Sequence, residues 1–309
     1  MGLVRAMGDD EVRLWLLEGD PAVRWRVLAH LDEAPPDQVA AERARVGEVG
    51  WGARLLDVQD REGTWSGALY SPKWVSTTYT LLHLMWLGLP AGHPSAHRGL
   101  DRLWEWRGRW KVPETCIQSM LIRLTATFDY PSTGLDPLVD DLLAQQQDDG
   151  GWNCETRTDR AKHSSFHTSV QALEALGAYE RAGGAIDVRD ALRGGLEFFG
   201  RHRLYLSHRT GEVAIPASTR FPAFPEWHFD VLRGLELFAA RDVADPRLAD
   251  GVEHLRSRCR SDGRWHTYAP YAGRHWFRLE ESGPSRWTTV RALAVLRWWE
   301  ASPSTARVA

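Results

Sequence analysis

The feature that most constrains the fold of this sequence is a short pattern that occurs three times. It lies in residues 56–65, 143–152 and 255–265. Each copy begins with a leucine and ends with an acidic residue, a glycine, one further residue and a tryptophan. Glycine in this place takes the left-handed conformation that ends a helix, and the tryptophan folds back onto that helix. A repeated helix stop predicts an array of helical hairpins, because each hairpin needs neighbours to bury its apolar face.

A second pattern, a polar start followed by an apolar helix, begins at Ser76, Cys116, His167, His228 and Trp287. The two patterns predict two alternating sets of helices. The first set spans 39–60, 96–107, 135–147, 186–202 and 245–260. The second set spans 73–88, 114–128, 164–181, 226–241 and 284–300. A further pair is expected at 10–18 and 21–32, where an Asp-Pro pair supplies an N-cap and a first-turn proline.

These helices predict an all-α chain folded as an α/α toroid, a closed ring of about six helical hairpins. The second set is the more apolar and is expected inside, with the charged first set outside. We expect one domain over 1–309: N-terminal helices in 1–50 that complete the ring, repeats in 51–301 and a flexible tail in 302–309. Period-two alternation is lacking, so strands should be few. Long loops precede the inner helices, so the starts of those helices should surround the mouth of a cavity.

Composition restricts the function classes. The chain of 309 residues has 38 Lys and Arg against 41 Asp and Glu, a net charge of -3. No basic excess is available for a nucleic-acid backbone. Three cysteines do not make a disulfide framework. The N-terminus lacks the apolar segment of a signal peptide, and the longest apolar stretch, 81–90, is shorter than the roughly 20 residues that span a bilayer. We therefore expect a cytoplasmic protein without a transmembrane segment.

The segment Gln-Gln-Gln-Asp-Asp-Gly-Gly-Trp at 145–152 resembles the QW-type repeat of the squalene/oxidosqualene cyclases and the protein prenyltransferase β subunits. With 51–88 and 245–300, the likeness covers most of the chain from about residue 50 onward. It implies an α/α toroid with a central apolar cavity and an isoprenoid-like substrate. The repeat is specific for the fold and does not specify the reaction.

The sequence departs from both families at their catalytic motifs. The Asp-x-Asp-Asp acid of the cyclases is absent, as is the Asp-Asp-x-x-Asp of ionising terpene synthases. In the prenyltransferase β subunits, zinc is bound by Asp, Cys and His; their Cys position falls on His167, their His position on His228 and their Asp position near Ser165. A peptide-prenylating enzyme would also need a partner subunit, on which the sequence is silent.

Cysteine and histidine residues at the predicted inner-helix starts are candidate zinc ligands, because thiolates and imidazoles suit that ion. Cys154, His167 and His228 are the first candidates, and Cys116 is an optional fourth. Three protein ligands would leave a position open to activate a water or thiolate or to polarise a carbonyl, whereas four would make the ion structural. The alternative is that these groups are hydrogen-bonded polar residues lining a cavity.

Acidic residues near the same mouth, Glu114, Glu155, Glu226 and Asp230, are candidate proton donors, because burial raises the pKa of a carboxyl. Asp230 and Glu155 are the candidates for catalysis, and Asp230 could also orient a histidine. The alternative is that these carboxylates cap helices or offset the helix dipole, an interpretation that we favour for Glu114 and Glu226.

Aromatic side chains at the inner-helix starts are candidates for substrate binding, because in terpene cyclases such rings stabilise carbocations. They are Trp74, Tyr79, Phe166, Trp227, Phe229 and Trp287. Packing in a helix-pair core is the alternative for most of them. Lys73 and Arg286 stand in similar contexts and could hold an anionic head group, unless they are ordinary surface charges.

These residues support three hypotheses. The first is a terpenoid cyclase-like or isomerase-like enzyme that acts on an isoprenoid or other apolar substrate in the central cavity, with Asp230 as the acid and zinc as a candidate electrophile. The second is a zinc-dependent, prenyltransferase-like transfer to a thiol or amine. The third is a barrel that binds an apolar ligand without catalysis.

Overall fold

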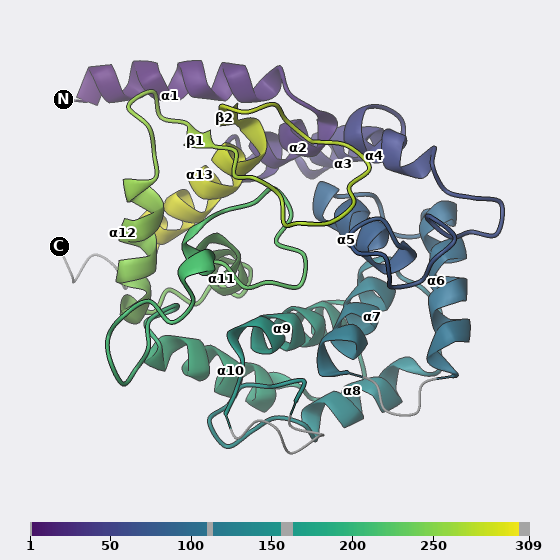
Figure 1. The fold of residues 1–309 in the computed structure, drawn as a ribbon. Helices are drawn as coiled ribbons and strands as arrows, with labels where there is room; N and C mark the ends of the chain where they lie inside the picture. Colours follow the sequence, from purple (N-terminus) through teal and green to yellow (C-terminus); the bar gives the residue numbers. More distant parts are fainter. Residues whose placement is uncertain (1, 110–113, 156–162, 303–309) are drawn as a thin grey trace.

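The computed structural model describes residues 2–109, 114–155 and 163–302 and confirms the all-α class. Figure 1 shows the helices arranged around a central region. The α-helices of the described residues are α1 (Gly2–Leu17), α2 (Pro21–His30), α3 (Pro36–Ala44), α4 (Gly50–Leu56), α5 (Thr77–Leu87), α6 (Pro94–Arg107), α7 (Thr115–Thr127), α8 (Leu135–Leu143), α9 (Phe166–Arg181), α10 (Arg189–Arg201), α11 (Val231–Ala239), α12 (Ala249–Ser257) and α13 (Arg286–Ala301). Residues 303–309 of the expected tail lie outside the described residues.

Strands are few, as predicted. β1 (Trp265–His266) pairs antiparallel with β2 (Pro284–Ser285), with Trp265 opposite Ser285. The two strands close the base of the long loop that precedes α13. The structure also has short 3₁₀ turns at 45–47, 216–219 and 246–248.

The repeated helix stop has the same geometry in all three copies. Its glycines have φ angles of +83°, +90° and +75° at Gly63, Gly150 and Gly263. Each tryptophan is buried, and its indole N–H donates to the carbonyl ten residues earlier. These bonds join Trp65 to Leu55 at 2.7 Å, Trp152 to Leu142 at 2.9 Å and Trp265 to Leu255 at 3.0 Å. The backbone N–H of each tryptophan donates to a hydroxyl of the next inner helix, on Thr77, Ser169 and Thr289. The motif thus fastens the end of one helix to the start of the next.

Two sets of helices are distinguished by their contacts. α5, α7, α9, α11 and α13 contact one another in that order, and α13 contacts α2. α2 reaches the end of α5, where the Trp25 indole N–H donates to the Leu87 carbonyl at 2.9 Å. α6 packs on α5 and α7, α8 on α7, α10 on α9 and α12 on α11, and these four helices lie further out in Figure 1.

Two predicted helices differ from the observed ones. The predicted helix over 39–60 is divided into α3, a 3₁₀ turn and α4, because Gly50 takes a φ of +78° between them. The helix predicted from residue 226 begins only at Val231. Glu226 has a left-handed backbone with φ +56°, and the Asp230 side chain caps the helix by accepting the Arg233 N–H at 2.9 Å.

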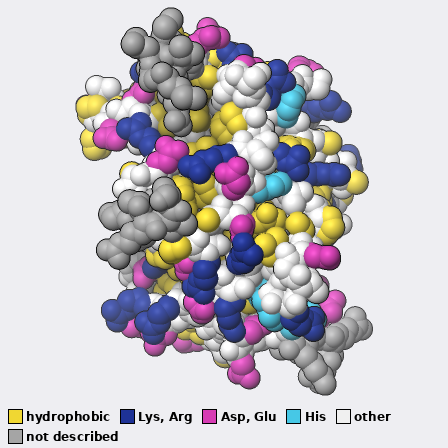
Figure 2. Space-filling view, turned by 90° about the vertical axis from the view of Figure 1, so that its left-hand side faces the viewer, with side chains coloured by type: hydrophobic (Ala, Val, Ile, Leu, Met, Phe, Trp, Pro, Cys, Tyr) yellow, Lys and Arg dark blue, Asp and Glu magenta, His cyan; other side chains and the backbone are white. Residues whose placement is uncertain are grey.

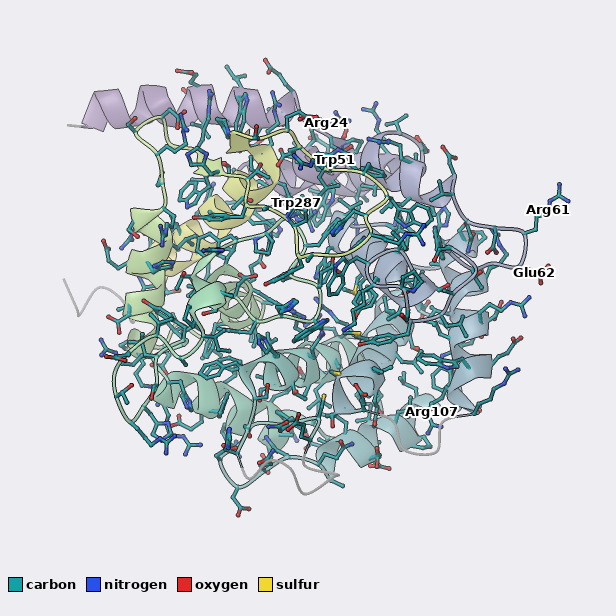
Figure 3. All side chains as sticks on the ribbon, viewed as in Figure 1. Arg24, Trp51, Arg61, Glu62, Arg107 and Trp287 are labelled. Atoms are coloured by element: carbon teal, nitrogen blue, oxygen red, sulfur yellow. The ribbon has the colours of Figure 1, made fainter. Side chains whose placement is uncertain are left out.

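The surface carries charges of both signs. Figure 2 shows basic and acidic side chains interspersed on one face, in line with the near-neutral net charge. In Figure 3 the labelled Arg61 and Glu62 point away from the body, whereas Trp51 and Trp287 pack edge to face, with ring centroids 6.2 Å apart. No helix of the described residues combines the length and the apolar character needed to cross a bilayer.

Candidate functional site

A large cavity lies where α7 and α9 begin and has a volume of about 1,090 Å³. We call it the mouth chamber. It brings together many of the predicted site residues, as the loop lengths had indicated. They are Lys73, Cys116, Cys154, Glu155, Phe166, His167 and Trp227. The expectation of a cavity at the starts of inner helices is met on this side of the molecule.

Cys154 is a half-buried thiol of the mouth chamber. Its sulfur accepts the backbone N–H of Cys116 in the first turn of α7 at 3.2 Å and the hydroxyl of Thr168 at 3.4 Å. Hydrogen bonds to a thiolate favour the charged form. Contact with the Cys116 thiol, followed by the Thr168 hydroxyl and the Cys116 N–H, lowers the pKa of Cys154 to about 7 against the opposing effect of burial. The same contact raises the pKa of Cys116.

Lys73, one of the two predicted anion-binding residues, lies close to two of the predicted aromatic residues at the edge of this chamber. The Lys73 ammonium lies 5.3 Å from the ring centroid of Trp227 and 5.7 Å from that of Trp74. These are cation–π distances. Glu155 lines the chamber as an exposed side chain.

The predicted zinc ligands separate into two pairs. Cys116 and Cys154 form one pair, and His167 and His228 form the other, with ring centroids 5.5 Å apart. His167 Nδ1 already accepts the Phe229 N–H at 2.8 Å, and His228 stays in the loop before α11, stacked between Trp227 and Tyr271. Across the residues that the structure describes, no three Cys, His, Asp or Glu side chains come together as a metal site. The arrangement does not fit the expected zinc centre.

A second, smaller cavity of about 200 Å³ lies between α5, residues 223–226 and the loop that joins β1 to β2. We call it the loop pocket. Its wall is mainly apolar and includes Leu55, Phe224, Pro270, Trp276 and Phe277. The loop is fastened over it by two indole N–H groups. Trp276 donates to the Thr80 hydroxyl and Trp74 donates to the Ala272 carbonyl, both at 3.0 Å.

The loop pocket contains a buried carboxylate–imidazole pair. His83 on α5 and Glu226 are 4% and 2% exposed. His83 Nε2 lies 2.9 Å and 3.0 Å from the two carboxylate oxygens of Glu226. The imidazole also stacks on Phe224, with centroids 4.0 Å apart and planes 8° from parallel. A hydrogen bond from Nε2–H to the carboxylate sets the tautomer and leaves Nδ1 as the basic nitrogen.

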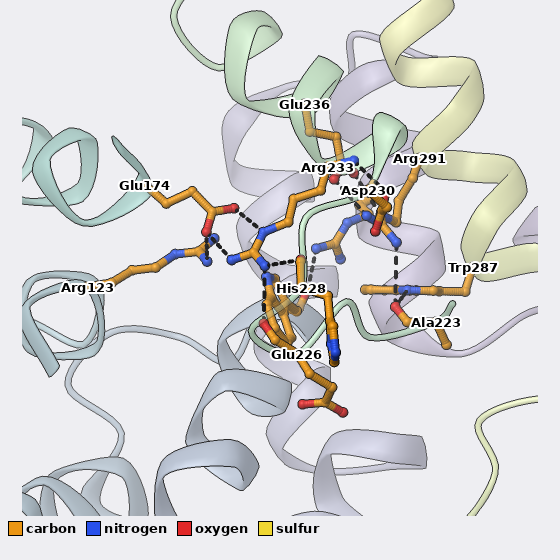
Figure 4. Close-up of polar contacts among 12 residues, drawn as sticks. Arg123, Glu174, Ala223, Glu226, His228, Asp230, Arg233, Glu236, Trp287 and Arg291 are labelled. Carbon is orange, nitrogen blue, oxygen red and sulfur yellow. Dashed lines mark hydrogen bonds and ion pairs between the residues drawn. The ribbon is translucent and has the colours of Figure 1, made fainter. Parts of the chain in front are cut away.

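Arg233 bonds the backbone of the segment that carries Glu226, as Figure 4 shows. The Arg233 guanidinium donates to the carbonyls of Glu226 at 3.1 Å and His228 at 2.6 Å. Its Nε donates to Glu174 at 3.0 Å, and Glu174 also pairs with Arg123. A non-glycine residue with a left-handed backbone persists only where its surroundings impose it. The network around Arg233 therefore fixes the backbone at Glu226, from which the carboxylate reaches His83.

Asp230, the predicted acid, lies in the core beside this network and lines neither the mouth chamber nor the loop pocket. One carboxylate oxygen caps α11, and the other is buried without a hydrogen-bond partner among the residues that the structure describes. Burial raises the pKa of Asp230 to about 6. A raised pKa makes a carboxylic acid weaker, so this group is unsuited to protonate an unactivated alkene.

Most of the other predicted substrate-binding residues belong to the packed core. Tyr79, Phe229 and Trp287 are at most 1% exposed, and the Trp287 indole N–H donates to the Ala223 carbonyl. Trp74 is buried against Tyr79 with ring centroids 4.8 Å apart. Arg286 donates to the Trp15 carbonyl and pairs with Glu18, which fastens α13 to α1.

His83 is the functional candidate that sequence reasoning missed. It stands in an apolar stretch, and a buried titratable side chain there is the one available signal. Glu226 was placed near the mouth by sequence, but the capping interpretation that we favoured for it is wrong. Glu226 pairs with His83 across 143 positions of sequence, and Asp230 caps the helix instead.

No family model matches the chain, and no curated protein matches it. Among solved structures, the chain is similar to a protein from Actinoplanes, with 15% sequence identity and a TM-score of 0.45 over 92% of this chain and 91% of that one.

Proposed function

We propose that this chain is an isomerase-like enzyme that moves a proton on a small, mainly apolar substrate in the loop pocket. His83 would act as base and then as acid, and Glu226 would orient and stabilise it. The observation that carries the proposal is the hydrogen-bonded His83–Glu226 pair, buried at the wall of an apolar cavity. Titratable groups placed in this way are concentrated at catalytic sites.

The proposed reaction has two proton transfers. His83 Nδ1 takes a proton from a carbon of the substrate, and the bonding electrons remain on the substrate as an enolate- or dienolate-like anion. The Glu226 carboxylate and the stacked Phe224 ring stabilise the imidazolium that forms. Nδ1 then delivers a proton, either the one it took or one exchanged with water, to a different carbon, so the product is an isomer and nothing is oxidised or reduced. The carboxylate orients the base as in catalytic triads, but with the two ring nitrogens exchanged: there the carboxylate bonds Nδ1–H and Nε2 is the base.

The chemistry of the pair limits the substrate class. An imidazolium is too weak an acid to protonate an isolated alkene, so alkene-initiated cyclisation is not what we propose. The removable proton must be activated, for example by a conjugated carbonyl. A cavity of about 200 Å³ is smaller than the roughly 300–1,000 Å³ of sites for drug-sized ligands. We therefore propose a small unsaturated carbonyl compound, of which short isoprenoid aldehydes are examples.

We also propose that the inner helices form the closed ring of an α/α toroid. The continuous series of contacts from α5 to α13, on to α2 and back to α5 through Trp25 and Leu87 supports this architecture. The resemblance to the cyclase and prenyltransferase repeats is consistent with it.

The test is deuterium uptake from D₂O into geranial and 3-methylbut-2-enal, followed by mass spectrometry. The wild type is expected to exchange the activated C–H protons. His83→Gln keeps an N–H donor for Glu226 but has no basic nitrogen, so its rate should fall by about 10²–10⁴. His275→Gln is the matched control, because His275 lines the same pocket and bonds only the Tyr271 carbonyl. Equal uptake in the wild type, His83→Gln and buffer would overturn the proposal in favour of a ligand-binding barrel.

A further inference from the structure

A third cavity, of about 500 Å³, lies at the face of the molecule where α9 and α11 end. Its floor is the Arg123–Glu174 pair, which also belongs to the network behind Glu226, so the cavity is on the far side of that network from the loop pocket. Five arginines line it: Arg26, Arg123, Arg181, Arg241 and Arg291. We call it the arginine pocket.

The lining carries more positive than negative charge. Against the five arginines stand two glutamates, Glu174 and Glu236. Glu174 is shared between Arg123 and Arg233, and Glu236 pairs with Arg291. Outside the lining, Glu180 pairs with Arg241. Both glutamates of the lining therefore already have arginine partners, while Asp242, next to Arg241, accepts the Trp298 indole N–H at 3.0 Å. The lining still carries more arginines than carboxylates.

Two of the five arginines have no carboxylate partner among the residues that the structure describes. Arg26 donates to the backbone carbonyls of Ala22, Trp86 and Leu87, and its guanidinium lies 4.1 Å from the ring centroid of Trp25. Burial and the nearby arginines lower the pKa of Arg26 to about 9. Arg181 is exposed at the rim and makes no ion pair with a described residue.

The guanidinium groups of Arg181 and Arg241 converge. A methyl group added at Gly177 would lie 3.3 Å from Nη1 of Arg181 and 3.7 Å from Nη1 of Arg241. Like charges repel each other, and an anion bound between them would remove this repulsion. The missing side chain at Gly177 leaves the space that such an anion would need.

Helix dipoles explain only part of this arrangement. Cations are stabilised near the C-terminal turn of a helix, which accounts for Arg181 at the end of α9 and Arg241 just after α11. Arg123 lies in the interior of α7 and Arg291 in the second turn of α13, where the dipole effect has faded. Their convergence with Arg26 on one cavity needs another reason.

We infer that the arginine pocket binds a phosphate-bearing anion. Planar guanidinium groups match phosphate oxygens in pairs. Trp25, Trp86 and Trp298 on the wall provide an apolar surface for an organic body attached to the phosphate. The site is separate from the proposed proton-transfer site and goes beyond that function.

The test is isothermal titration calorimetry of the full chain with pyrophosphate at low salt, with inorganic phosphate and an organic phosphate monoester in parallel. We expect one saturable site for pyrophosphate. Arg181→Glu should weaken binding about tenfold or more, because it removes one charge-assisted contact and adds a repulsive charge. Arg193→Glu is the matched control. It changes the net charge equally but lies on the exposed face of α10, where Arg193 pairs with Asp190. Tighter binding of the monoester than of pyrophosphate would identify an organic phosphate as the ligand.

Arg26→Gln provides a second variant, and its thermal unfolding shows whether it is folded. Binding is expected to weaken in the folded variant. Equal affinities of Arg181→Glu and Arg193→Glu, or no saturable heat with any phosphate, would overturn the inference. His83→Gln should bind pyrophosphate like the wild type, so failure of the proposed enzymatic function is distinguished from failure of this site.

Discussion

The mouth chamber and the loop pocket lie on the same side of the inner helices but differ in size and chemistry. The mouth chamber has about 1,090 Å³ and contains the thiols and most of the predicted residues. The loop pocket has about 200 Å³ and contains a buried carboxylate–imidazole pair. His228 separates them, stacked 3.7 Å from Trp227 on one side and 3.6 Å from Tyr271 on the other.

The difference shows that the larger of these two cavities is not the one that contains the buried acid–base pair. In an apolar pocket, charge interactions are stronger than in water. The mouth chamber is open enough to admit larger molecules but offers its polar groups to solvent. We therefore assign proton transfer to the loop pocket.

The largest expected effect is the loss of stability when Arg233, which bonds the backbone at Glu226 and His228, is replaced. Arg233→Met removes the donors to the Glu226 and His228 carbonyls and leaves Glu174 and Gln171 with fewer partners. Breaking a buried ion pair costs about 3–5 kcal/mol. Urea unfolding should show that loss. Arg256→Met breaks the exposed pair with Glu300 and should cost less than about 1 kcal/mol. Similar losses for the two variants would contradict the role of Arg233.

The next effect is the dependence of the unfolding free energy on pH that Asp230 causes. Its pKa is raised to about 6 by burial, so the folded state prefers the protonated carboxyl. This contribution to stability is complete below the unfolded pKa near 3.8 and is lost as pH rises through 6. The loss is about 3 kcal/mol for a shift of this size. Asp230→Asn should lack this term, so its unfolding free energy relative to the wild type should rise by that amount between pH 4 and pH 7. A constant difference would refute the assignment.

A smaller effect is the difference in alkylation rate between the thiols of Cys154 and Cys259. At pH 7 about half of Cys154 is thiolate, whereas burial raises the pKa of Cys259 above 9.0. Iodoacetamide should therefore modify Cys154 about tenfold faster or more, allowing for the lower nucleophilicity of a low-pKa thiolate. Thr168→Val removes a hydrogen bond to the sulfur and should slow this reaction. Mass spectrometry of timed samples measures both rates, and equal labelling of the two cysteines would show that the mouth chamber does not activate Cys154.

The smallest expected effect lies at the rim of the mouth chamber. Lys73→Met removes the ammonium near Trp227, and an exposed cation–π contact contributes about 0.5–1 kcal/mol. Thermal unfolding should change little, and deuterium uptake in the loop pocket should stay at the wild-type rate. A large loss of uptake would mean that the mouth chamber takes part in the reaction.

Much of the fold could be predicted because its signals are local. The glycine and tryptophan of each helix stop act within ten residues of the helix that they end, so Trp65, Trp152 and Trp265 were recognisable from sequence alone. Residues at the starts of α7 and α9 were also placed correctly at one cavity.

The pair in the loop pocket could not be predicted, because it depends on tertiary structure. His83 looks like an interruption of an apolar helix, and Glu226 looks like a helix cap. Their contact arises from the left-handed backbone at Glu226 and from the bonds that Arg233 makes to the loop. The zinc prediction does not fit the structure for a related reason. The cap at Asp230 starts α11 after His228, so that His228 stays in the loop and does not align with His167.

The most direct test of the central assignment compares one variant in each cavity. Deuterium uptake into geranial should be measured side by side for the wild type, His83→Gln and Cys154→Ala. The account predicts that His83→Gln loses the activity and that Cys154→Ala retains it. Loss of uptake in Cys154→Ala with retention in His83→Gln would contradict the account and place the chemistry in the mouth chamber.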